Sequence, residues 1–176
     1  MTVRSPGRPL HLARRFVGSL RHGDVSPADA AWVRARLLDG EADLWVRMSD
    51  ADRRHAVGVA RRVDGVLDGA PRPVLAAALL HDVGKVTSGL GTWARVVATL
   101  LGAVTSADAH GRWAARGGAL GRLGRYLRHP DEGAALLSVA GSDPLTVAWA
   151  AEHHRPPARW TVEASIAEAL WAADDD

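Results

Sequence analysis

The segment VLAAALLHDVGKV, residues 74–86, carries the main clue to the fold. Its first seven residues are apolar on every side of a helix, which is typical of a buried helix rather than of one at the surface. The run leads directly into His81 and Asp82. Burying an imidazole beside an ionised carboxylate is costly unless both groups have partners. His81 and Asp82 therefore lie either at a solvated edge or against a positively charged group.

The length and composition of the chain limit both the size of the fold and the kind of site. Its 176 residues suit one domain, or one domain with a short appendage. Because the chain has no cysteine, any metal ion must be held by histidines and carboxylates. The N-terminal residues lack the apolar core of a signal peptide, and the longest apolar stretch, residues 96–104, is too short to span a bilayer. We expect a cytoplasmic protein with no membrane partner.

The charge pattern does not favour a nucleic-acid polymer as a partner. The formal net charge is only +2, and the paired arginines are scattered among acids, as on solvated helix faces. The only lysine of the chain, Lys85, lies within the segment that contains His81 and Asp82.

Helix signals recur throughout the chain, whereas no segment alternates polar and apolar residues for long enough to predict a strand. Ser26, followed by a proline, is a typical helix start, and Ser49, with an acid three residues later, resembles a capping box. Gly84 is expected to end the apolar helix in a left-handed conformation. Thr161 is expected to cap the last helix. The sequence therefore predicts an all-α protein.

One all-helical domain is expected from residue 41 to residue 176. Residues 1–40 are predicted to form an N-terminal extension of one or two helices packed on that domain. The region from Gly89 to Gly124 is apolar but rich in glycine, so we expect helix with interruptions there.

Seven side chains that can bind metal ions occur at predicted helix ends or on inward helix faces. His55 falls in line with Val59 at a spacing of four, and Asp174 follows Leu170 in the same way. Taken singly, each has an ordinary explanation as a core histidine, a cation at a helix C-terminus or a frayed acidic tail. Together they form a candidate metal site composed of His55, His81, Asp82, His129, His153, His154 and Asp174. Such ligands suit Fe, Mn, Zn or Ni better than Ca or Mg alone. The other histidines are interpreted as surface residues: His11, His22 and His110.

Five segments, in order, resemble motifs of the HD-domain metal-dependent phosphohydrolases. They are RMSDADRRHAVGVA (47–60), AAALLHDVGK (76–85), RHPDEGAALL (128–137), AWAAEHHRPP (148–157) and IAEALWAADD (166–175). An isolated His-Asp dipeptide is weak evidence, but the ordered set H…HD…H…HH…D is specific. The resemblance extends from about residue 47 to the C-terminus.

The resemblance implies an HD-domain-like bundle of helices around a metal site, with extra helices at the N-terminus. It implies two divalent transition-metal ions, of Fe, Mn or Ni, with Zn or Mg as further options. The first ion would be held by His55, His81, Asp82 and Asp174, with Asp82 bridging, and the second by His129, His153 and His154. Asp82 would also orient the attacking water, and Lys85 would contact the substrate phosphate. The implied activity is hydrolysis of a small phosphorylated substrate, a nucleotide, at a phosphoester or phosphoanhydride bond.

Two other functions are compatible with the same ligand set. Some members of the superfamily hold a di-iron centre that activates oxygen, and a third reading is a non-catalytic regulator that retains the fold. The Gly-Tyr-Pro motif of the cyclic-dinucleotide branch is replaced by HHRPPARW, residues 153–160, which disfavours that activity. The long separation of Asp82 from His129 indicates an insertion near residues 99–118 that forms a lid or a wall.

Overall fold

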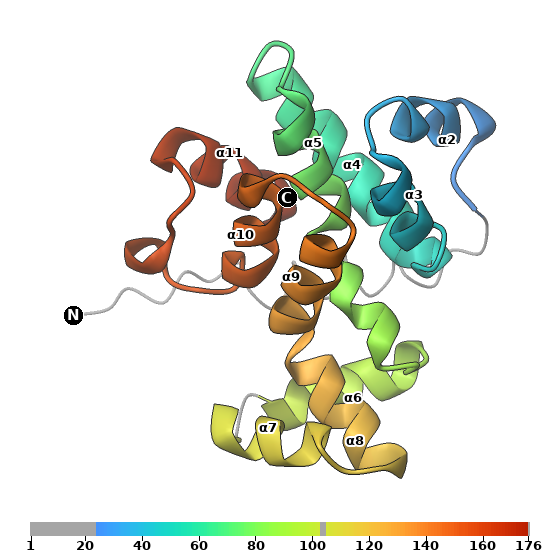
Figure 1. Ribbon diagram of the computed structural model, residues 1–176, viewed down its shortest axis with the longest axis vertical. Helices are drawn as coiled ribbons and strands as arrows, with labels where there is room; N and C mark the ends of the chain where they lie inside the picture. Colours follow the sequence, from blue (N-terminus) through green and yellow to red (C-terminus); the bar gives the residue numbers. More distant parts are fainter. Residues whose placement is uncertain (1–23, 103–104, 176) are drawn as a thin grey trace.

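The computed structural model describes residues 24–102 and 105–175, and this part of the chain contains helices but no strand (Figure 1). The expected all-α class is therefore confirmed. The α-helices are α2 (Pro27–Arg34), α3 (Asp39–Trp45), α4 (Asp50–Val66), α5 (Arg72–Leu80), α6 (Thr92–Gly102), α7 (Ala107–Ala114), α8 (Gly118–Leu127), α9 (His129–Val139), α10 (Pro144–Glu152) and α11 (Ala164–Asp175). Two 3₁₀ helices, η1 (Val83–Thr87) and η2 (Pro157–Arg159), complete the fold.

Helix α5 lies at the centre of the core, as its apolar sequence predicts. Every residue from Val74 to Leu80 is buried. Helices α4 and α10 pack against α5, and α11 packs in turn against α4. Trp149 of α10 and Leu170 of α11 are fully buried in the same cluster. The hydrophobic effect stabilises each such buried side chain by roughly 1.5–3 kcal/mol, and this holds α5 between its neighbours.

The predicted caps at Ser26 and Ser49 are confirmed, whereas the predicted cap at Thr161 is wrong. The Ser26 hydroxyl accepts a hydrogen bond from a backbone N–H of α2, and the Ser49 hydroxyl does the same for α4. Thr161 instead donates its N–H and its hydroxyl to the buried Glu152 carboxylate, both at 2.7 Å. Helix α11 starts later, and the Glu163 carboxylate accepts hydrogen bonds from its first N–H groups. The buried carboxylate of Glu152, at the end of the preceding α-helix, α10, thus outcompetes the local cap.

Gly84 does not end α5 in a left-handed conformation, so this prediction is also wrong. The chain continues from α5 into η1, and Gly84 lies within η1 without a positive φ. A Cβ atom at Gly84 would lie 1.9 Å from the carbonyl oxygen of His129 and 2.6 Å from the backbone nitrogen of Gly133. The glycine therefore permits η1 and α9 to approach backbone to backbone.

Helices α6, α7 and α8 form a lobe below the core in the view of Figure 1. These helices follow the expected pattern of helix with interruptions. The lobe is tied to the core by an ion pair between Arg95 of α6 and Asp52 of α4 at 2.6 Å. Arg125 of α8 also donates a hydrogen bond to the Thr87 carbonyl at 3.0 Å. The lobe is thereby anchored at both α4 and η1.

Helix α2 contributes Val33 to the same core as α4 and α5. Residues 1–23, which include His11 and His22, lie outside the described part of the chain. The division into residues 1–40 and 41–176 stays a prediction. None of the described helices combines the length and the apolar character needed to cross a membrane.

Replacing Gly84 with alanine should destabilise the protein, because the added methyl group would overlap the backbone of α9. We expect Gly84→Ala to lower the free energy of unfolding by about 2–3 kcal/mol in urea denaturation. Gly65→Ala is the matched control, since Gly65 also lies in a helix but has open space around its Cβ position. This control should gain up to about 1 kcal/mol. Equal stability of the two variants would contradict the close backbone contact.

Candidate metal centre

The seven predicted ligands come together from five helices. His55 lies on α4, His81 and Asp82 follow α5, His129 begins α9, His153 and His154 follow α10, and Asp174 lies in the last turn of α11. They form two groups, and within each group the candidate ligand atoms lie within 4.8 Å of one another. We call His55, His81 and Asp174 the first group, and Asp82, His129, His153 and His154 the second group.

The first group is arranged around the Asp174 carboxylate. His55 Nε2 lies 2.8 Å from Asp174 Oδ1, and His81 Nε2 lies 3.5 Å from the same oxygen. His81 Nε2 is also 3.5 Å from Asp82 Oδ2, which belongs to the second group. One imidazole nitrogen therefore faces both carboxylates.

The second group is arranged around the other oxygen of Asp82. Asp82 Oδ1 lies 3.3 Å from His129 Nε2 and 3.8 Å from His153 Nε2. His154 Nε2 lies 3.2 Å from His129 Nε2. Asp82 thus presents one oxygen to each group and stands between them.

Three of the imidazole rings are held in the same way. His81, His129 and His153 each place Nδ1 at 2.8–2.9 Å from the carbonyl oxygen three residues earlier. Each follows the last turn of a helix, where backbone carbonyls lack partners within the helix. With Nδ1 donating its proton, Nε2 carries the lone pair that a metal ion needs. The helix ends therefore orient these three nitrogens toward the centre of the site.

The donor set and its spacing fit a divalent cation. The Nε2 atoms of His81 and His153 are buried and make no hydrogen bond to any described residue. Leaving such a polar atom without a partner costs about 1–3 kcal/mol. Two donor atoms that share one ion at about 2.1 Å each lie roughly 3–4 Å apart, and most spacings here agree with that range. The second group, which is the more buried one, could hold a metal ion.

The charges of the site also favour a cation. Burial raises the pKa of Asp82, but Lys85 and His81 outweigh that effect and hold the pKa well below its usual value. Burial lowers the pKa of His81, but Asp82 and Asp174 outweigh it, and the pKa is raised. The carboxylates therefore attract a proton or a metal ion to His81 Nε2.

The two histidines that follow α10 are neutral near pH 7. Burial, reinforced by the neighbouring His154 and His81, lowers the pKa of His153 well below its usual value. Partial burial of its ring and the proximity of His129 lower the pKa of His154 to about 4, although the residue as a whole is exposed. Neutral imidazole is the form that binds a metal ion.

Lys85, the second residue predicted to be catalytic, lies against the site. Its ammonium group forms an ion pair with the Asp82 carboxylate, and only 14% of the side chain is exposed. It also lowers the pKa of Asp52, for which burial alone would raise it. The only lysine of the chain therefore contacts one of the candidate ligands directly.

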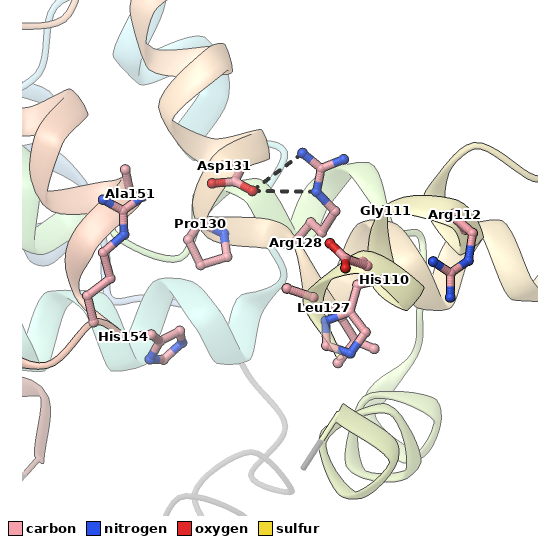
Figure 2. A pocket seen from close by; sticks show the side chains of 12 residues that line it. His110, Gly111, Arg112, Leu127, Arg128, Pro130, Asp131, Ala151 and His154 are labelled. Atoms are coloured by element: carbon pink, nitrogen blue, oxygen red, sulfur yellow. Dashed lines mark hydrogen bonds and ion pairs between the residues drawn. The ribbon is translucent and has the colours of Figure 1, made fainter. Parts of the chain in front are cut away.

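A pocket of about 740 Å³ lies beside the second group, between α7 on one side and the end of α8, the start of α9 and the end of α10 on the other (Figure 2). His154 lines the pocket, and it is the only exposed member of the second group. His110 lines the opposite wall, half-buried, with Nε2 at 2.8 Å from the Thr105 hydroxyl. Sequence reasoning placed His110 at the surface, and no local pattern indicates its place in a pocket wall.

Comparison with known proteins gives no relative for this chain: no family model, no curated protein and no solved structure matches it. The likeness of its motifs to HD-domain phosphohydrolases therefore stays a prediction. What the structure itself provides is an all-helical fold with a His/Asp cluster that could hold a metal ion.

Removing a ligand from the second group should lower the amount of metal bound. We expect His153→Ala and His154→Ala to reduce the metal content by roughly half, because each removes a neutral imidazole that the other ligands cannot replace. His110→Ala is the control, since this ring lies outside both groups. Mass spectrometry of the protein loaded with Mn or Fe measures the ratio. Unchanged metal content in both ligand variants would remove them from the site.

Proposed function

We propose that this protein is an HD-type, metal-dependent phosphohydrolase that cleaves a phosphoester or phosphoanhydride bond of a small nucleotide-type substrate. The observation that supports this most is the convergence of seven side chains from five helices, with Asp82 standing between the two groups that they form. The seven occur in the order H…HD…H…HH…D, and no cysteine contributes.

The proposal assigns two ions to the site. The first would be held by His55, His81, Asp174 and one oxygen of Asp82, and the second by His129, His153, His154 and the other oxygen. Imidazole with carboxylate favours Fe, Mn or Ni, with Zn and Mg as further options. When bound, such an ion pair lowers the pKa of a water molecule toward neutrality and offers positive charge to two oxygens of a phosphoryl group.

Asp82 and Lys85 then have complementary roles. Asp82 accepts a hydrogen bond from the attacking water and so directs its oxygen toward phosphorus. The water oxygen forms a bond to phosphorus and releases its proton to solvent, while the bond from phosphorus to the leaving oxygen breaks and that oxygen takes a proton from water. Lys85, beside Asp82, offsets the negative charge on the phosphoryl oxygens, which is where most catalysis of phosphoryl transfer arises.

The positive side chains around the site favour phosphoryl chemistry over oxygen activation. Lys85 contacts Asp82, and three arginines line the adjacent pocket. A phosphorylated substrate needs such cations, whereas dioxygen, being neutral, does not. Phosphate release without oxygen consumption would support the hydrolase, and oxygen consumption by the iron-loaded protein would support a di-iron oxygenase instead. Metal content well below one ion per chain would support the non-catalytic regulator.

Asp82→Ala should abolish metal-dependent phosphate release, because both groups would lose the carboxylate between them. We expect a loss of at least about 10³-fold in turnover. Helical circular dichroism should remain, which separates loss of the site from loss of the fold. Asp39→Ala is the matched control, since that carboxylate is 97% exposed on α3. Normal turnover of the Asp82 variant would refute the assignment of the site.

Lys85→Ala should lower kcat by about 10²-fold while the metal content stays the same. The lysine is paired with Asp82 but is not a ligand, so its loss removes charge stabilisation and not the ions. Lys85→Arg retains the charge and should recover part of kcat. Steady-state kinetics with parallel metal analysis tests this prediction. A fall in metal content equal to the fall in kcat would instead make Lys85 a support for the ligands.

A further inference from the structure

The pocket next to His154 is larger than cleavage of one phosphate requires. Its volume, about 740 Å³, lies within the range of about 300–1,000 Å³ that is usual for sites of small organic ligands. Figure 2 shows His154 on one side and His110 with Arg112 on the other, with Pro130 between them. One wall thus belongs to the candidate metal centre and the opposite wall to α7 of the lobe.

The strongest ligand-binding groups in this pocket are arginines. Arg112 lies on α7, Arg128 lies at the junction of α8 and α9, and Arg155 directly follows His154. Arg128 forms an ion pair with Asp131 at 3.4 Å, which neutralises part of its positive charge. Arg112 and Arg155 make no side-chain hydrogen bond or ion pair with any residue in the described ranges.

The other residues that line the pocket limit which kind of ligand it can bind. The remaining carboxylate, Asp108, lies in the first turn of α7 and offsets part of the positive charge. Small and apolar residues make up most of the other lining. The only aromatic rings among the lining residues are the imidazoles of His110 and His154, so no large aromatic side chain is present on which a base could stack. Two available guanidinium groups favour a phosphate over a nucleobase.

We infer that this pocket binds a second phosphate group of the substrate, separate from the one that is cleaved, through Arg112 on the α7 wall. This inference rests on the proposed phosphohydrolase function. The cleaved phosphate would lie at the metal centre beside His154, and the second would lie toward α7. A substrate with two separate phosphates can occupy both places, whereas a monophosphate occupies only the first. The lobe therefore selects bisphosphorylated substrates.

The test compares adenosine 3′,5′-bisphosphate with adenosine 5′-monophosphate as substrates of the metal-loaded protein. We expect kcat/KM to be at least about tenfold higher for the bisphosphate, since a charged hydrogen bond contributes about that factor. Arg112→Ala should reduce this ratio about tenfold, mainly through KM. Arg122→Ala on α8 and Arg159→Ala on η2 are matched controls, because both are exposed and neither lines the pocket.

A wild-type ratio near one, or an unchanged ratio in the Arg112→Ala variant, would overturn the inference while the hydrolase function stands. If neither nucleotide is hydrolysed, calorimetric binding of adenosine 3′,5′-bisphosphate to the metal-free protein decides the question. Binding that weakens at least about tenfold in the Arg112→Ala variant but not in the controls supports the pocket without the hydrolase. Equal binding in all variants overturns the pocket as well.

Discussion

The buried carboxylate of Asp82 is the group on which the arrangement of the site depends. An ionised carboxylate removed from water is unfavourable unless cations or donors surround it. Here Lys85 supplies a fixed positive charge, and histidines approach from both sides. The pKa of Asp82 remains well below its usual value despite burial. Each helix that ends near Asp82 contributes a group that stabilises the charge.

The backbone geometry of helix ends determines where the ligands point. His81 and His153 directly follow α5 and α10, and each donates from Nδ1 to a carbonyl of the helix it follows. His129 does the same after α8. This arrangement needs the close approach of η1 to α9, which Gly84 permits. The distance between Asp82 and His129 therefore depends on a glycine that binds nothing itself.

The lobe formed by α6, α7 and α8 gives the site a second side. The core helices provide the wall that contains the ligands, and α7 of the lobe provides the wall opposite His154. The ion pair from Arg95 to Asp52 and the hydrogen bond from Arg125 to Thr87 hold the lobe against α4 and η1. The wall opposite His154 is thus fixed in position. The lobe thus provides one wall of the pocket, and the core provides the candidate metal ligands.

The sequence by itself determined the helical class, the burial of α5 and the identity of the ligand-type residues. These features depend on local signals: the apolar run before His81, the serine caps of α2 and α4, and the spacing of His55 on its helix. Local signals suffice because a helix is stabilised by contacts between residues only a few positions apart.

Only the tertiary structure decided how the two groups share Asp82, why position 84 is glycine, which carboxylate Thr161 contacts, and that His110 lines a pocket. Each of these depends on contact between backbone or side-chain atoms from separate helices. Such contacts are set by how helices pack, and packing depends on the shapes of many side chains at once. No short stretch of sequence contains that information, because the partner in each contact lies elsewhere in the chain.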